Sequence, residues 1–199
     1  MLCRLRLVSL LCLAAGGLAL AGCATAPPRP AFPPITFAQV APIKLDVREI
    51  EVERAYQPPH TAPNVEHFFA VPPAAAATLW AVDRLIAAGP QRRARFIVRE
   101  ASVVEIPLKQ SGGLTGAFTT EQSERYDARL VVEIEIVSED GRVGGTITVE
   151  VTHSRTVPEN LTLGERERVW HEMTRALMGE LDVQLDTTIK EAFYAFLIL

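Results

Sequence analysis

The sequence predicts an α+β domain, a two-layer sandwich in which two helices cover one face of a mainly antiparallel four-stranded sheet, in the order β-α-β-β-β-α. Residues 125–137 and 142–157 alternate apolar and polar side chains, as strands with one buried and one wet face do. Asp140-Gly141 between them favours a hairpin turn. Apolar residues at helical spacing after Thr162 predict a long helix that packs on the buried face.

Residues 43–53 are predicted to form the first strand. Apolar and charged side chains alternate from Ile43 to Val47, and the apolar row then slips by one residue before Ile50. One inserted residue near Glu49 produces such a slip, so we expect a β-bulge there.

The first helix is predicted over residues 74–88. Two prolines precede it, and proline is tolerated at a helix start, while Gly89 and Pro90 end it. Its predicted buried stripe has spacings of four, three and four and consists of Ala75, Leu79, Val82 and Ile86. Trp80 flanks this stripe and is expected at the edge of the core rather than at a ligand site.

The second strand is predicted over residues 95–108. Polar residues around Glu100 interrupt its apolar row, so this strand is expected to be bulged or to leave the core midway.

A glycine-rich loop follows over residues 110–122. Leu114 and Phe118 are apolar residues of this loop and are the candidate partner contact. The simpler interpretation is a flexible hairpin tip without a partner.

A capping box, Thr162-Leu163-Gly164-Glu165, starts the last helix, because the threonine hydroxyl and the glutamate carboxylate satisfy free N–H groups there. Apolar residues then recur every four positions at Val169, Met173, Leu177, Leu181, Leu185, Ile189 and Phe193. A period of four drifts around a 3.6-residue helix by ~40° per step, so we expect a bend or break before the C-terminus. Residues 193–199 are apolar, and they either dock on the domain or contact a partner or membrane.

The first 23 residues have the features of an export signal. Arg4 and Arg6 precede an apolar run of about 14 residues, which is shorter than the ~20 residues of a membrane-spanning helix. Leu20-Ala21-Gly22-Cys23 resembles the bacterial lipobox. This resemblance implies cleavage between Gly22 and Cys23, which removes residues 1–22. It also implies that Cys23 carries a diacylglycerol and a fatty acyl chain such as palmitate.

The alternative for Cys23 is an ordinary buried thiol in a membrane helix. Five prolines follow between residues 24 and 34, and proline cannot continue a helix. The other cysteines, Cys3 and Cys12, lie before the cleavage point, so Cys23 has no disulfide partner in the mature chain. Its remaining use is lipid attachment, and several acyl chains anchor a protein stably where a single chain is marginal.

Residues 23–42 are predicted to be the lipidated cysteine and a proline-rich tether, and residues 43–199 a single α+β domain. Proline-rich linkers extend by ~3.1 Å per residue. The tether also contains three apolar residues, Phe32, Ile35 and Phe37. They either pack on the edge of the domain or touch a partner or the membrane.

The charge excludes some partners. The whole chain has a net charge of −4, and removal of Arg4 and Arg6 with the signal makes it more acidic. A general nucleic-acid binder has a basic footprint, so nucleic acid is not expected as a partner.

No catalytic residue, metal site or cofactor other than the lipid is predicted. His171-Glu172 begins like a zinc-protease motif, but position 175 is arginine where the second histidine ligand belongs. The carboxylates that share the wet face of the predicted sheet are Glu133, Glu135 and Glu150. Paired carboxylates perform acid–base chemistry when their pKa values split, but on an exposed sheet they are more often solvated residues.

The lipobox, the proline-rich tether and the element order together resemble the envelope lipoproteins of the LptE type and the PqiC-like auxiliary lipoproteins of ABC-type transport. The resemblance implies a non-enzymatic accessory in envelope lipid or lipopolysaccharide transport or assembly. Its periplasmic domain would be held by the lipid anchor and would bind an envelope protein or lipid. Ala24 stands where a retention aspartate is found, which favours the outer membrane over the inner. A periplasmic hydrolase or ligand-binding enzyme, and a purely structural tethered domain, stay open as alternatives.

Overall fold

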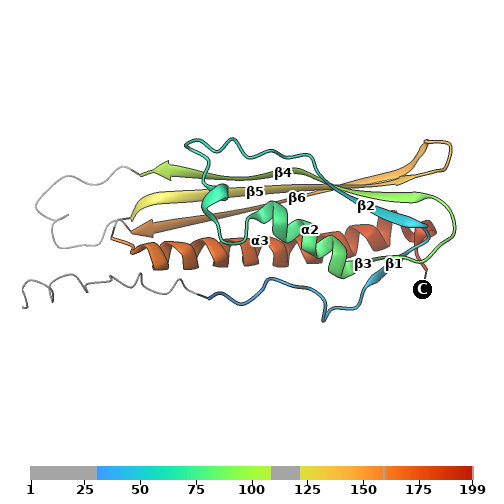
Figure 1. Ribbon diagram of the computed structural model, residues 1–199, viewed down its shortest axis with the longest axis horizontal. Helices are drawn as coiled ribbons and strands as arrows, with labels where there is room; N and C mark the ends of the chain where they lie inside the picture. Colours follow the sequence, from blue (N-terminus) through green and yellow to red (C-terminus); the bar gives the residue numbers. More distant parts are fainter. Residues whose placement is uncertain (1–30, 109–121, 159, 199) are drawn as a thin grey trace, which may run out of the picture.

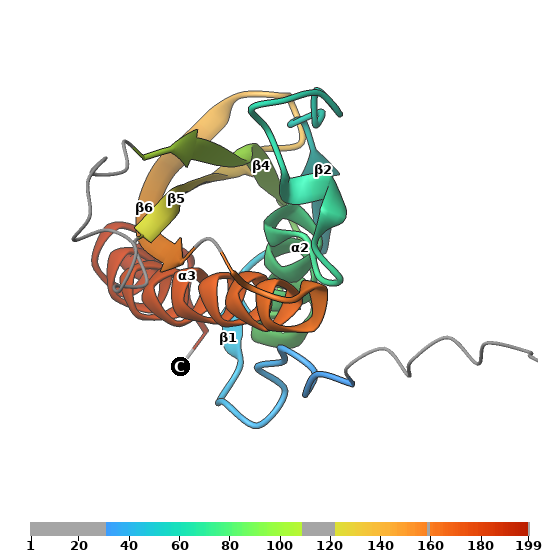
Figure 2. The same cartoon turned by 90° about the vertical axis from the view of Figure 1, so that its left-hand side faces the viewer.

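The computed structural model describes residues 31–108, 122–158 and 160–198, and it confirms the α+β fold class. A four-stranded sheet has the order β2-β4-β5-β6, and the helices α2 (Pro73–Arg84) and α3 (Leu163–Ala192) lie on one side of it (Figures 1 and 2). The strands are β2 (Glu49–Arg54), β4 (Arg93–Pro107), β5 (Gln122–Val137) and β6 (Val143–Pro158). The remaining elements are β1 (Ile43–Leu45), β3 (Leu85–Ala87) and two short 3-10 helices, η1 (Glu66–Phe68) and η3 (Tyr194–Phe196).

The sheet is mainly antiparallel, as predicted. β4 pairs with β5 and β5 with β6 in antiparallel register, while the edge strand β2 runs parallel to β4. The expected irregularity in the second long strand is a register shift between Val98 and Glu100. The turn between β5 and β6 contains Gly141 at a φ of 81°, a conformation that glycine adopts without steric cost.

The core lies between the sheet and the helices. The β5 side chains that the alternation assigns to the buried face are all buried: Tyr126, Ala128, Leu130, Val132, Ile134 and Ile136. The full apolar stripe of α3, from Val169 to Ile189, is buried as well. The hairpin pattern and the helix stripe therefore identified the two facing layers correctly.

The predicted first strand is in fact two strands in different sheets. β1 pairs in parallel with β3 in a separate two-stranded sheet, whereas β2 joins the main sheet beside β4. Between them the buried side chain of Val47 faces the core, and the N–H of Arg48 donates to the carbonyls of Gln91 and Arg92. The slip in the apolar row marks this change of sheet, not a bulge within one strand.

The first helix is shorter than predicted and buries a different face. α2 ends at Arg84, and the next three residues form β3. Its buried residues are Pro73, Ala76, Ala77, Trp80, Ala81 and Arg84. Of the predicted stripe, Ala75 is half-buried, and Leu79, Val82 and Ile86 are 40%, 66% and 43% exposed. The small alanines let the helix lie close to the core. Trp80 is fully buried in the core, with its ring centroid 5.8 Å from that of Phe96.

The expected break in the long helix does not occur, because α3 runs unbroken for 30 residues. The capping box is confirmed: the Thr162 hydroxyl accepts from the N–H of Glu165, and the Glu165 carboxylate accepts from the N–H of Thr162 at 2.8 Å. The sheet that α3 crosses is strongly twisted (Figure 2). A stripe that winds around a straight helix can therefore stay in contact with it along the whole length.

Both ends of the described chain pack on the domain. Ile35 is buried, and Phe37 packs against the core. At the other end Phe193 is buried, and the N–H of Ile198 donates to the carbonyl of Lys44. The apolar C-terminus therefore docks on the domain. None of the helices in the described ranges is both long enough and apolar enough to span a membrane.

Candidate functional site

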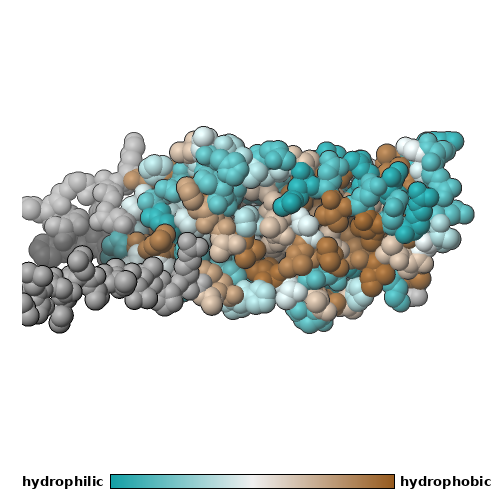
Figure 3. Space-filling model, viewed as in Figure 1, coloured by the Kyte–Doolittle hydropathy of each residue, from teal (hydrophilic) through white to brown (hydrophobic). Residues whose placement is uncertain are grey.

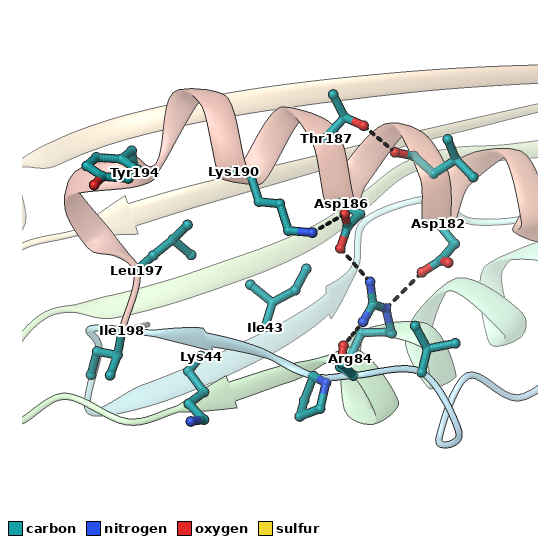
Figure 4. Close-up of a pocket in the computed structure, with 14 residues that line it drawn as sticks. Ile43, Lys44, Arg84, Asp182, Asp186, Thr187, Lys190, Tyr194, Leu197 and Ile198 are labelled. Atoms are coloured by element: carbon teal, nitrogen blue, oxygen red, sulfur yellow. Dashed lines mark hydrogen bonds and ion pairs between the residues drawn. The ribbon is translucent and has the colours of Figure 1, made fainter.

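A groove of about 700 Å³ lies between the N-terminal segment, the second half of α3 and the C-terminal residues (Figure 4). Its apolar walls are Val40, Ala41, Pro42, Ile43, Val183, Tyr194, Leu197 and Ile198. Two lysines, Lys44 and Lys190, also line it. A mainly apolar cavity of this size with a few charged groups is typical of a binding site for a small molecule or a peptide.

Arg84 forms the polar floor of the groove. Its side chain is only 2% exposed, and its guanidinium lies 2.8 Å from both Asp182 Oδ1 and Asp186 Oδ1 (Figure 4). It also donates to the carbonyl of Ala41 in the N-terminal segment. The indole N–H of Trp80 donates to Asp182 at 2.8 Å. This network joins α2, α3 and the N-terminal segment, and its charges are mutually compensated, so we assign it a structural role.

Asp83, the residue before Arg84, binds the same N-terminal segment at two residues that precede Ala41. The Asp83 carboxylate accepts from the Thr36 hydroxyl and from the N–H of Phe37, each at 2.7 Å. Lys190 then pairs with Asp186 at the rim of the groove. The position of the groove wall formed by residues 40–44 thus depends on two adjacent residues at the end of α2.

The outward face of α2 adds apolar surface outside the groove. Leu79 and Val82 are exposed there, and Ile86 continues the row on β3. Figure 3 shows brown, apolar surface gathered over the part of the molecule that α2 and β3 occupy. Contiguous exposed apolar surface of this kind marks interaction sites more often than isolated apolar residues do.

The carboxylates on the outer face of the sheet are paired with arginines. Glu133 lies 2.6 Å from Arg99, and Glu135 lies 2.6 Å from Arg95. Glu150 accepts two hydrogen bonds of 2.8 Å from Arg129. The hydrogen bond from its arginine lowers the pKa of Glu133, and the same is true of Glu150. A general acid needs a raised pKa, so Glu133 and Glu150 are poorly suited to that role.

The structure does not place the residues that the sequence predicted as the lipidation site and the partner contact. Gly22, Cys23, Leu114 and Phe118 all lie outside the described residues. Within the described ranges, no group of three or more histidine, cysteine or acidic side chains is placed to hold a metal ion.

Sequence reasoning missed Arg84, Asp182 and Asp186. Arg84 lies off the stripe that the sequence assigned to the buried face of the first helix, and the two aspartates stand four residues apart beside the stripe of α3. Neither feature shows that α2 and α3 meet at these residues.

Comparison with protein-family models finds no match, and comparison with curated proteins finds none either. Among solved structures, the chain is similar to a minor lipoprotein from Acinetobacter baumannii, with 17% identity and a TM-score of 0.38 over 74% of this chain and 93% of that one. It is also similar to the rare lipoprotein B from Shewanella oneidensis, with 11% identity and a TM-score of 0.36 over 72% of this chain and 95% of that one.

Proposed function

We propose that the protein is a lipid-anchored lipoprotein of the bacterial envelope, whose domain binds a partner protein or lipid without catalysing a reaction. The observation that carries this proposal is Leu20-Ala21-Gly22-Cys23 after a basic start and an apolar run too short to span a bilayer. We propose that the protein is located at the outer membrane, with its domain in the periplasm. The proposed role is that of an accessory in envelope lipid or lipopolysaccharide transport or assembly.

The groove beside Arg84 is the proposed binding site. It is mainly apolar, and Lys190 at its rim is already paired with Asp186, so it suits a partner that presents mainly apolar surface. The paired, low-pKa carboxylates of the sheet favour binding over the alternative of a hydrolase.

Replacing Cys23 with serine tests the anchor. We expect the variant to retain residues 1–22 and to incorporate no labelled palmitate, because serine lacks the thiol that receives the lipid. Intact mass spectrometry and palmitate labelling in a bacterial host measure both effects. Cys12→Ser is the matched control, since Cys12 lies within the predicted signal, and it should be processed and acylated normally. Recovery of the native chain with residues 1–22 in place and Cys23 unmodified would contradict the proposal.

A photo-crosslinking side chain at Tyr194 tests the groove. Tyr194 lines the groove and is 70% exposed, so this replacement should leave the fold intact. Irradiated cell envelopes are expected to give a discrete lipid or protein adduct on this variant. The same side chain at Arg142, which is 85% exposed on the β5–β6 hairpin, is the control and should give none. Equal labelling from both positions, or none from Tyr194, would rule out the groove as the binding site.

A further inference from the structure

The N-terminal segment joins the domain beside the start of α3. The ring of Phe32 stacks on His171 with 4.8 Å between centroids, and Ile35 is buried nearby in the chain. Ala31 lies eight positions after Cys23 in the chain. A fully extended chain spans at most ~3.6 Å per residue, so this end of the domain lies within about 29 Å of a lipidated Cys23.

Two large apolar side chains are exposed at this same end. Phe68 is 61% exposed, and its ring stacks at 6.4 Å on that of Trp170, the neighbour of His171. Leu163, in the first turn of α3, is 70% exposed and lies eight residues, or about 12 Å, before His171 along the helix. Both side chains therefore lie at the same end of the domain as Phe32, the second residue of the described chain.

The charges around this end compensate one another. Arg166 pairs with Glu124, Arg155 pairs with Glu172, and Glu165 is used in the capping box. A surface with little net charge and exposed apolar side chains suits insertion of those side chains into a lipid surface better than electrostatic attraction to anionic headgroups. The groove lies toward the other end of α3, where Lys190 is 19 residues, or about 28 Å, beyond His171.

We propose that Phe68 and Leu163 form a membrane-contact surface on the bilayer that holds Cys23, so that the start of α3 faces the membrane and the groove faces away from it. The occupant is a lipid surface because a lipidated Cys23 is only eight positions from Ala31 along the chain, which keeps this end near the bilayer. This inference rests on the proposed lipid anchor, but the anchor alone does not require it, since a tethered domain can also tumble freely.

The test uses the full-length chain, acylated in cells and reconstituted in phosphatidylethanolamine–phosphatidylglycerol vesicles. The mature chain has no cysteine besides Cys23, so Phe68→Cys, Leu163→Cys and Val143→Cys each introduce one reactive thiol for an environment-sensitive dye. Dyes at 68 and 163 are expected to show blue-shifted emission and quenching by a lipid-bound quencher. The dye at Val143, a matched apolar position that is 55% exposed at the start of β6 and does not line the groove, should show neither.

A second variant separates contact from mere proximity. With the dye at the exposed Arg168, the double change Phe68→Ser and Leu163→Ser should abolish lipid quenching while mass spectrometry still finds the acylated chain. Quenching at Val143 equal to or greater than that at 68 and 163, or unchanged quenching in the double variant, would overturn the inference. A chain without acyl groups on Cys23 would instead refute the proposed function, so the two failures are distinguishable.

Discussion

Replacing Arg84 with alanine is expected to lower the free energy of unfolding by about 3 kcal/mol, because removing one partner of a buried ion pair strands the other. The guanidinium is almost fully buried, while its two partners, Asp182 and Asp186, are 18% and 29% exposed. Water can still reach these carboxylates, which keeps the expected cost at the lower end of the range for buried pairs. The carbonyl of Ala41 also loses its donor, so residues 40–44 should become less well fixed.

Denaturant unfolding measures this effect, with Lys190→Ala as the control. Lys190 pairs with the same Asp186 but is 61% exposed, so its removal should cost well under ~1 kcal/mol. If the two substitutions cost the same, Arg84 does not act as a buried link between α2, α3 and the N-terminal segment.

The loss of unfolding free energy caused by Arg84→Ala should also depend on pH. Burial raises the pKa of Asp186, but the hydrogen bonds from Lys190 and Arg84 outweigh burial, and the pKa lies below the ordinary value of 3.8. A carboxyl with a lowered pKa stabilises the fold above its unfolded pKa and loses that contribution as the pH falls through its folded value. The difference in stability between wild type and Arg84→Ala should therefore shrink below about pH 3.8.

Gly89→Ala is expected to destabilise the protein by about 3 kcal/mol, the upper end of the usual cost of overpacking. A Cβ at position 89 would lie 2.1 Å from Asp46 Oδ1, 2.6 Å from the Asp46 carbonyl carbon and 2.8 Å from its Cα. The side-chain oxygen can rotate away, but the backbone atoms cannot move without displacing β1. The N–H of Gly89 also donates to the carbonyl of Val47 at 3.0 Å, so the segment cannot move aside cheaply.

Gly179→Ala is the matched control, because it is the same substitution with the opposite expected sign. A Cβ at position 179 meets no other atom within 4 Å, and the residue lies inside α3. Alanine is favoured over glycine in a helix by ~1 kcal/mol, so this variant should raise the thermal midpoint while Gly89→Ala lowers it. A neutral Gly89→Ala would show that the contact of residue 89 with Asp46 is not tight.

Elements whose signals are local were predicted well. The alternation of residues 125–137 and 142–157 places the β5–β6 hairpin within a few residues, and Asp140-Gly141 lies at its turn. The capping box at Thr162 starts α3 where expected. These features depend on side chains that lie two to four residues apart, so the sequence contains both partners of each interaction side by side.

Elements whose ends or pairing depend on a segment distant in the sequence were predicted less well. The helical stripe over residues 74–88 continues past Arg84, but β1 offers the next three residues a parallel strand partner, and α2 ends there. The slip in the row before Ile50 predicts a bulge, but a change of sheet produces the same pattern. Only the neighbours of each half, β3 for one and β4 for the other, decide between them.

The sequence by itself determined the α+β class, the β5–β6 hairpin and the capped start of α3, and the lipid anchor at Cys23 stays a prediction of the sequence. The tertiary structure alone decided that Arg84 is buried, because the aspartates that compensate its charge lie 98 and 102 residues away in the chain. It also decided that Leu79 and Val82 are exposed while alanines face the core. Burial depends on which surfaces meet, and hydrophobic periodicity in one helix does not contain the shape or charge of the surface against which that helix packs.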